Sequence, residues 1–237
     1  MPRPIRGLLF DKDGTLFDFD ATWSAVVARI IDAVAPDPHA ARRMAELGGY
    51  DPDTRRFLPG SPIVAGAVDE TARLWAPLLG GPSPLEVAQQ IAGLSEALTG
   101  PETLVPAVSD LPGLLAGLKT QGRELGVATH DGEAAARAQL AAVGALAAFD
   151  FVAGYDSGYG HKPSTGMLAA FCSRVAVTPQ ETAVIGDSLH DLQMARAGGA
   201  LAIGVLTGPA TEADLAPHAD LILPSIAALP GWLSDRR

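Results

Sequence analysis

The sequence predicts an α/β protein in which a doubly wound parallel sheet, the Rossmann-like architecture, carries an inserted helical cap domain. Short, uniformly apolar runs that end in Gly, Asp or Thr recur along the chain, with helical patterns between most of them. Uniformly apolar strands that alternate with helices are typical of a parallel sheet covered on both faces. One long segment after the first run has helical patterns only, which indicates an insertion.

Six apolar runs are the predicted strands of the sheet. They cover residues 5–10, 124–129, 149–154, 182–187, 201–206 and 219–224. Helical patterns such as LPGLLAGLKTQG, GEAAARAQLAAVG and residues 163–174 fall between them. Ligands of doubly wound sheets bind beyond the carboxyl ends of the strands. The residues directly after each run are therefore the candidates for a functional site.

The segment from residue 18 to residue 105 breaks the alternation. Four helices are predicted in it, with Pro/Gly-rich joints at 58–62 and 80–84 and no clear strand: Ala21–Val34, Pro38–Leu47, Ala65–Leu78 and Leu85–Leu98. The predicted domains are thus a core of residues 1–17 and 106–237 and a helical cap of residues 18–105 over the strand ends. Asp20 is placed to cap the helix that starts near Ala21.

Composition and charge exclude several classes of protein. The chain has 237 residues, 48% of them hydrophobic, a net charge of −10 and a single cysteine, Cys172. An acidic chain without a basic run does not suit a surface that follows nucleic-acid phosphates. A lone cysteine allows no internal disulfide and fits a small core residue in a reducing compartment.

Neither a signal peptide nor a membrane span is expected. Only Gly-Leu-Leu-Phe separates Arg6 from Asp11, which is too short for a signal-peptide core. The longest uncharged stretch, Ala197 to Thr211, is broken by Gly and Pro and is too short to cross a bilayer. We expect a soluble, cytoplasmic protein, either a monomer or a homodimer.

The stretch LLFDKDGTLFDFD places two acids, Asp11 and Asp13, at the mouth of the first predicted strand. Asp-Gly is a common turn pair, but a turn explains Gly14 and not two carboxylates beside a buried strand. A calcium loop fails on spacing, because Leu16 stands where Gly is needed and Thr22 where the bidentate Glu should be.

Further polar residues follow the next three runs. Thr129 ends the second run, Lys162 lies in a Gly/Pro-rich loop after the third, and Asp187 and Asp191 follow the fourth. Each of these residues could instead have an ordinary structural role. Thr129 or a neighbour can cap a helix, a lysine can be solvated, and an N-cap accounts for one of the two later acids.

Together these residues have consistent chemistry. Asp11, Asp13 and Asp187 offer the oxygen ligands that Mg²⁺ prefers, and Thr129 and Lys162 offer a donor and a cation to phosphate. A carboxylate that attacks phosphorus gives an aspartyl-phosphate. The negative charge of four aspartates and a phosphate dianion is larger than the positive charge of Mg²⁺ and Lys162. This excess favours the protonated form of one of the acids. Asp13 is the candidate to lend that proton to the leaving group.

The chain resembles the phosphoglycolate-phosphatase-like group of the haloacid dehalogenase (HAD)-like hydrolase superfamily. The motifs are DKDGTL (11–16), VATHD (127–131), HKPSTG (161–166) and VIGDSLHD (184–191), in the family's order across the core. The resemblance implies Asp11 as nucleophile and Asp13 as general acid/base. It also implies Mg²⁺ held by Asp11, the carbonyl of Asp13 and Asp187.

The resemblance assigns the remaining motif residues as well. Thr129, His130 and Lys162 would bind the phosphoryl group, and Asp191 would support the metal or Lys162. His130 stands where relatives usually have Asn, and Ser164-Thr165 replace the usual continuation to a second proline. These departures concern the shape of the phosphate cradle.

Related families differ at single residues. Ion-pumping ATPases have Thr at the position of Asp13, and dehalogenases lack this second acid. Phosphonate-cleaving relatives use a cap lysine, but no lysine lies between Lys12 and Lys119. A sugar phosphomutase stays open, because only the cap decides whether water or a sugar hydroxyl accepts the phosphoryl group.

The expected function is that of a Mg²⁺-dependent phosphatase of small phosphorylated metabolites, with phosphoglycolate as the leading substrate. In the cap, Arg55, Arg56 and Ser61 are the candidates for substrate selection, since an arginine suits a carboxylate or a second phosphate. A solvated arginine is the ordinary alternative for each. The other hypotheses are a sugar phosphomutase of the β-phosphoglucomutase type and a phosphate-binding module without turnover.

Overall fold

The computed structural model describes residues 4–58, 60–65, 68–100 and 102–234. The chain divides into two compact units. The first, called the core unit, consists of Met1–Asp18 and Pro106–Arg237, and the second, called the helical unit, of Phe19–Val105.

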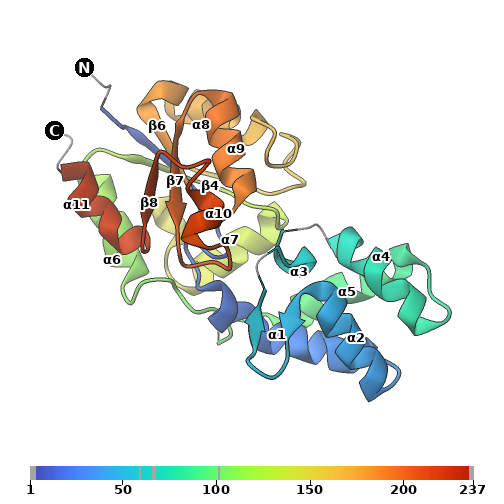
Figure 1. Ribbon diagram of the computed structural model, residues 1–237. Coiled ribbons are helices and arrows are strands. Elements are labelled where there is room, and N and C mark those ends of the chain that lie inside the picture. Colours follow the sequence, from blue (N-terminus) through green and yellow to red (C-terminus); the bar gives the residue numbers. More distant parts are fainter. Residues whose placement is uncertain (1–3, 59, 66–67, 101, 235–237) are drawn as a thin grey trace. The chain divides into compact units, whose positions relative to one another are not determined.

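A six-stranded parallel sheet forms the centre of the core unit (Figure 1). Its strands are β1 (Gly7–Phe10), β4 (Glu124–Ala128), β5 (Phe151–Ala153), β6 (Thr182–Gly186), β7 (Leu201–Val205) and β8 (Leu221–Leu223). They lie in the order β5-β4-β1-β6-β7-β8. After β1, the chain adds β4 and β5 on one side of it. It then crosses to the other side of β1 and adds β6, β7 and β8. The strand order therefore reverses between β1 and β6, where a doubly wound sheet binds its ligands. The predicted fold class is confirmed.

Helices lie on both faces of this sheet. They are α6 (Leu111–Thr120), α7 (Glu133–Ala142), α8 (Gly166–Val175), α9 (Leu189–Gly198), α10 (Glu212–Leu215) and α11 (Leu229–Ser234). Figure 1 shows α6 and α11 on one side of the sheet and α8 and α9 on the other. Because both faces are covered, every residue of β1 is buried, and Leu9 packs in one cluster with Phe171 of α8 and Leu192 of α9.

The helical unit has a hydrophobic core of its own. Its helices are α1 (Phe19–Val34), α2 (Pro38–Gly48), α3 (Pro62–Ala65), α4 (Val68–Leu79) and α5 (Pro84–Leu98). Val26, Met44 and Trp75 are almost fully buried in one cluster, and the Trp75 indole donates to the carbonyl of Met44 at 2.9 Å. Ser83 and Glu86 form a capping box at the start of α5.

The structure corrects three expectations for this unit. A short antiparallel hairpin, β2 (Tyr50–Asp51) with β3 (Arg56–Phe57), lies where no strand was expected, because two residues per strand are too few to show an alternation. The predicted helix 65–78 corresponds to α4, which begins at Val68 and ends at Leu79, while Ala65 is the last residue of α3; residues 66 and 67, like residue 59 of a predicted joint, lie outside the described residues.

The third correction concerns Asp20. Helix α1 begins at Phe19, so Asp20 is in its first turn, and its Oδ1 accepts a hydrogen bond from the backbone N–H of Phe57 at 3.1 Å. The predicted N-cap is wrong, and Asp20 instead ties the hairpin to α1. Among the described residues, none of the helices combines the length and apolarity that crossing a membrane requires.

Candidate active site

The candidate site lies at the carboxyl ends of β1, β4 and β6, where the strand order reverses. Asp11 directly follows β1, Thr129 follows β4, and Asp187 follows β6. Each of these residues is buried. Because the strands are parallel and in register, the sheet brings these three residues to one edge.

Three carboxylates meet at this edge. One oxygen each of Asp11, Asp187 and Asp191 lies within 4.8 Å of the others. Asp191 is in the first turn of α9, where its Oδ2 accepts a hydrogen bond from the Ser188 hydroxyl at 2.6 Å. The capping box of α9 thus fixes Asp191 with Oδ1 facing the cluster.

Lys162 is the cation of the cluster. Its Nζ lies 2.7 Å from Asp11 Oδ1 and 2.7 Å from Asp191 Oδ1, and the side chain is buried. Burial alone lowers the pKa of Lys162, but the charges and hydrogen bonds of the two carboxylates raise this pKa above its usual value. Lys162 is therefore a permanent ammonium group beside Asp11.

The three carboxylates outnumber this one cation. Burial raises the pKa of Asp11 to about 7, with the charge of Asp191 adding to the rise and Lys162 opposing it. Burial, and then the charges of Asp11 and Asp191, raise the pKa of Asp187 well above its usual value. The raised pKa values mean that the three carboxylates repel one another and that positive charge is lacking at this edge. A hard divalent cation, which prefers oxygen ligands, would supply this charge. Asp11 and Asp187 would hold it, since Lys162 and Ser188 engage both oxygens of Asp191.

We predict that stability falls as pH rises when no divalent cation is present, and that a divalent cation stabilises the protein more at high pH than at low pH. Folding raises the pKa of Asp11 from 3.8 to about 7. The folded state then holds protons that the unfolded chain releases, so without metal the melting temperature should fall as pH rises from about 5 to about 8. Since a cation binds the ionised carboxylates, Mg²⁺ should raise the melting temperature by several degrees near pH 8 and less near pH 5.5.

Thermal unfolding with EDTA and with Mg²⁺ checks this prediction. In Asp187→Asn most of the cation effect should disappear, whereas Asp220→Asn, on the surface of the same unit, should keep it. A cation effect of equal size at both pH values would contradict the proton competition.

His130 lies beside Lys162 but is not a cation. Its Nε2 is 3.2 Å from the backbone carbonyl of Lys162, and burial, followed by the charge of Lys162, lowers the pKa of His130 to about 4. A neutral imidazole that bonds a carbonyl carries its proton on Nε2, which leaves Nδ1 without one. The side chain of His130 therefore holds the Lys162 loop.

Thr129 starts the loop after β4. Its backbone N–H donates to the carbonyl of Ala153, and its Oγ1 accepts a hydrogen bond from the N–H of Asp131 at 3.1 Å. The helix that follows has Gly132 as its N-cap, so Thr129 does not cap it. The hydroxyl hydrogen of Thr129 is thus available to a ligand oxygen at the strand end.

Several residues of the site were not singled out by sequence. Thr15 donates to Asp187 Oδ1 at 3.4 Å, and Thr207 donates to the carbonyl of Gly14 at 2.6 Å. A Cβ on Gly14 or Gly208 would overlap the Asp187 carboxylate, and Gly14 also has φ of +80°. Thr207 and Gly208 directly follow the run 201–206, so the rule of inspecting strand ends would have found them.

Lys12 is the second buried cation here. Its Nζ lies 2.5 Å from Asp13 Oδ2 and 3.0 Å from Asp131 Oδ2, and it donates to Gln139 Oε1 at 2.6 Å. Asp13 is thus placed against Lys12, while Asp11 is placed against Lys162. The charge count from sequence omits Lys12 and so understates the positive charge beside Asp13.

The cap candidates lie in the helical unit. Ser61 is buried and its hydroxyl donates to the carbonyl of Gly48 at 2.7 Å, so this group is engaged within the unit. Arg55 has φ of +55°, and its carbonyl accepts from the Ser24 hydroxyl at 2.8 Å. Its side chain is exposed, as is that of Arg56.

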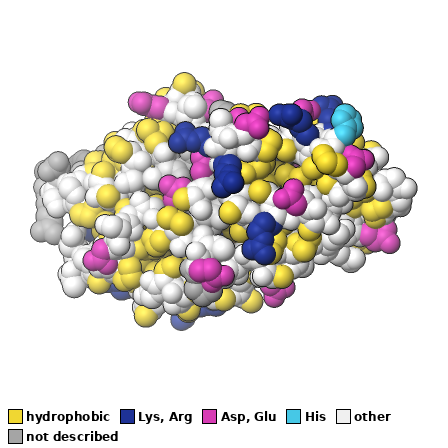
Figure 2. All heavy atoms as spheres, turned by 90° about the horizontal axis from the view of Figure 1, so that it is seen from below, with side chains coloured by type: hydrophobic (Ala, Val, Ile, Leu, Met, Phe, Trp, Pro, Cys, Tyr) yellow, Lys and Arg dark blue, Asp and Glu magenta, His cyan; other side chains and the backbone are white. Residues whose placement is uncertain are grey.

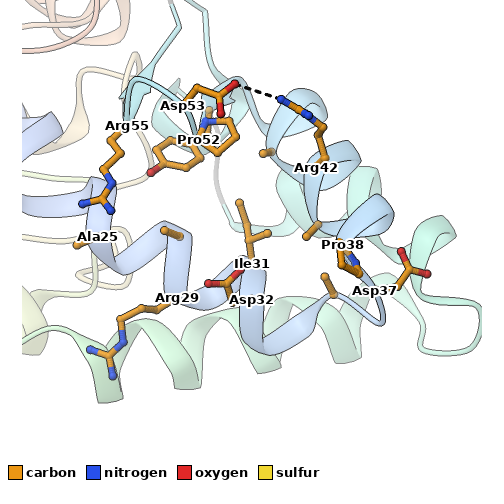
Figure 3. Close-up of a pocket in the computed structure, with 15 residues that line it drawn as sticks. Ala25, Arg29, Ile31, Asp32, Asp37, Pro38, Arg42, Pro52, Asp53 and Arg55 are labelled. Carbon is orange, nitrogen blue, oxygen red and sulfur yellow. Dashed lines mark hydrogen bonds and ion pairs between the residues drawn. The ribbon is translucent and has the colours of Figure 1, made fainter.

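Arg55 borders a hollow of about 830 Å³ between α1, α2 and the hairpin. Figure 3 shows the guanidinium groups of Arg29 and Arg55 toward the same end of this hollow, while Arg42 is paired with Asp53. A smaller hollow beside it is lined by Arg55 and Arg56. Among the arginines that the structure describes, those whose side chains make no ion pair or hydrogen bond are Arg29, Arg55, Arg56 and Arg174. Three of them border these hollows.

Comparison with known proteins agrees with this geometry. A model of the haloacid dehalogenase-like hydrolase family matches residues 5–199. A probable phosphatase, IndB of Dickeya dadantii, is 40% identical over 119 residues, which span 48% of this chain and 52% of that protein. The phosphoglycolate phosphatase of Thiobacillus denitrificans is 30% identical over 238 residues, 95% of this chain and 94% of that protein.

A solved structure has the same fold. The crystal structure of a putative beta-phosphoglucomutase from Thermotoga maritima matches with a TM-score of 0.71 and 18% identity, covering 98% of this chain and 99% of that one. The chain belongs to the haloacid dehalogenase-like hydrolase family. The predicted family and the prediction of a hydrolytic enzyme are confirmed, and the names of the two relatives support a phosphatase.

Proposed function

We propose that the protein is a Mg²⁺-dependent phosphatase of small phosphorylated metabolites that works through an aspartyl-phosphate on Asp11. The observation that carries this proposal is the pairing of Asp11 with Lys162 next to Asp187, at the reversal of the strand order. The Asp11 carboxylate can act as a nucleophile toward a phosphate ester. The ammonium group of Lys162 and a cation held by Asp187 would balance the negative charge of that ester.

In the first proposed step an oxygen of Asp11 attacks phosphorus, and the bond from phosphorus to the ester oxygen breaks. Asp13 donates a proton to that oxygen, which leaves as an alcohol. Lys162 and the Thr129 hydroxyl bind the phosphoryl oxygens during the transfer. Bound Mg²⁺, held by Asp11, Asp187 and, as the family resemblance implies, the carbonyl of Asp13, would supply charge neutralisation between nucleophile and phosphate.

In the second proposed step water attacks phosphorus of the aspartyl-phosphate. Asp13, now ionised, accepts a proton from this water, the acyl phosphate bond breaks, and Asp11 is restored as phosphate leaves. Asp191 keeps Lys162 in place in both steps, since Lys162 would otherwise have Asp11 as its one carboxylate partner among the described contacts.

Small phosphomonoesters of the phosphoglycolate type are the proposed substrates. The support is the relative from Thiobacillus denitrificans, which carries that name and matches nearly the whole chain. Figure 2 shows Lys and Arg side chains dispersed among acidic and apolar ones on the face in view, and the net charge is −10. Both suit a small phosphate ester better than a nucleic acid. A cytoplasmic location stays a prediction from sequence.

Substrate selection is proposed for the exposed arginines of the helical unit. Arg55 and Arg56 were candidates from sequence, and Arg29 joins them because it borders the same hollow as Arg55. A guanidinium without an ionic partner can bind a carboxylate or a second phosphate on the substrate. Ser61 fits this role less well, because its hydroxyl already donates to Gly48.

The second candidate function is a sugar phosphomutase, favoured by the fold shared with the Thermotoga maritima protein. A panel of phosphate esters that includes phosphoglycolate and a hexose 1-phosphate distinguishes the two. We expect phosphate release that requires Mg²⁺ and stops with EDTA. Conversion of the hexose phosphate without phosphate release would instead support the mutase, and binding without turnover of any ester would support a phosphate-binding module.

The same panel tests the arginines. Arg55→Ala should raise KM about tenfold or more for esters with a carboxylate and change KM little for esters without one. Arg174→Ala removes an unpaired arginine of the core unit and is the matched control. Equal KM changes for both classes of ester would argue against anion recognition by Arg55.

A further inference from the structure

Lys12 is buried more deeply than its charge would normally permit. Its side chain has no exposed area, and its ammonium group lies among Asp13, Asp131 and Gln139, with the Phe17 ring 5.5 Å away. Burial opposes the charged form, but the two carboxylates more than offset it, so the pKa of Lys12 is raised. Lys12 is thus a fixed ammonium group inside the core unit.

The partners of Lys12 come from three places in the chain. Asp13 follows β1, Asp131 belongs to the loop after β4 that also carries Thr129, and Gln139 is on α7. Lys12 therefore ties the loop of the proposed general acid/base to the loop of the proposed phosphate ligand. A surface lysine would form neither link firmly, because exposed ion pairs are weak and mobile.

The contact with Asp13 bears on chemistry. Lys12 engages Oδ2 of Asp13 at 2.5 Å. An anchored Oδ2 fixes the plane of the carboxylate and hence the direction of its other oxygen. A proton transfer needs its donor within hydrogen-bond reach and correctly oriented, so a small rotation of this carboxylate slows it.

We propose that Lys12 is a positioning residue that orients the Asp13 carboxylate for proton transfer to the leaving group and from water. This inference rests on the proposed function of Asp13. The residues already proposed for the site are Lys162 and the four acids Asp11, Asp13, Asp187 and Asp191. Lys12 would act through Asp13, without touching the phosphate or the metal.

The test uses leaving groups that differ in their need for a proton. In Lys12→Met, kcat for an alkyl phosphate should fall about 10²-fold while KM stays within about threefold. p-Nitrophenolate leaves without a proton, so its first turnover should stay fast. The following turnovers should be slow, because water attack still needs Asp13. Rapid-mixing experiments should therefore show a burst of one equivalent of p-nitrophenolate per active site.

Matched variants separate positioning from folding. Lys119 also contacts two carboxylates, Glu124 and Asp150, but at the surface, so Lys119→Met should have wild-type kinetics. Lys12→Arg keeps the cation and should recover part of the alkyl-phosphate activity. If Lys12→Met does not fold, as judged by thermal unfolding, Asp131→Asn loosens the same network and should show the same dependence on leaving group in milder form.

Two results would overturn the inference. One is a Lys12→Met enzyme with wild-type kinetics on both substrates; the other is an equal loss on both, in the first turnover as well as later ones. The variant Asp13→Asn shows whether such a result disproves only the role of Lys12 or also the proposed function. If Asp13→Asn is inactive on alkyl phosphates while Lys12→Met is normal, only the role of Lys12 is wrong. If Asp13→Asn is fully active, the proposed mechanism itself fails.

Discussion

Replacing Asp11 by asparagine is expected to lower the turnover of every phosphate ester about 10⁴-fold or more. The carboxamide has nearly the same shape but is a very poor nucleophile, so no acyl phosphate can form. Removal of one carboxylate also relieves the crowding that raises the pKa of Asp187. The folded state should therefore persist, and the loss should lie in kcat. Initial rates of phosphate release measure it, and acid-quenched wild-type enzyme should contain phosphate on the peptide with Asp11.

Asp18→Asn is the matched control for this result. Asp18 belongs to the same acidic stretch, seven residues after Asp11, at the end of the first segment of the core unit, and it is not one of the three clustered carboxylates. Its replacement should leave kcat within about twofold of wild type. An Asp11→Asn enzyme with wild-type turnover would rule out the covalent mechanism.

The second large effect is expected from the smallest possible change, Gly208→Ala. A Cβ at this position would overlap the carboxylate of Asp187, which has little room to move because it is almost fully buried. The carboxylate must then leave the position in which it faces Asp11 and Asp191. We expect the Mg²⁺ concentration for half-maximal activity to rise about 10- to 100-fold. Activity measured against Mg²⁺ concentration tests this directly.

Gly117→Ala provides the comparison. Gly117 lies within α6, where an added Cβ meets nothing within 4 Å. Alanine there should stabilise the protein by about 0.5–1 kcal/mol and leave the Mg²⁺ dependence unchanged. If Gly208→Ala has the Mg²⁺ dependence of wild type, then Asp187 does not bind the metal in the way proposed.

Much of the core unit was predictable because its information is local. Each strand is a short apolar run with both faces buried, and chain order together with the handedness of crossovers places the strands. The residues that follow the runs then meet at one edge, which is why Asp11, Thr129 and Asp187 could be grouped before the structure was known. Their distances are set by strand register and loop shape, which no spacing in the sequence encodes.

Other features depend on contacts that are distant in the sequence. The partners Asp131 and Gln139 lie more than a hundred residues from Lys12, so the sequence shows an ordinary lysine in a loop. Gly208 is one of 26 glycines, and its importance comes from the nearness of Asp187. The hairpin at Tyr50–Phe57 is too short for any periodicity.

The route by which the chain leaves and re-enters the core unit has a consequence for evolution. Phe17 and Pro106 form an antiparallel bridge, and the N–H of Ala107 donates to the carbonyl of Leu16 at 2.9 Å. The exit and the return thus lie side by side, joined by backbone groups whose pairing does not depend on side-chain identity. Such a junction tolerates the exchange of everything between its ends. New substrate ranges can then arise by replacing one insert with another, while the aspartates of the core unit continue the same reaction.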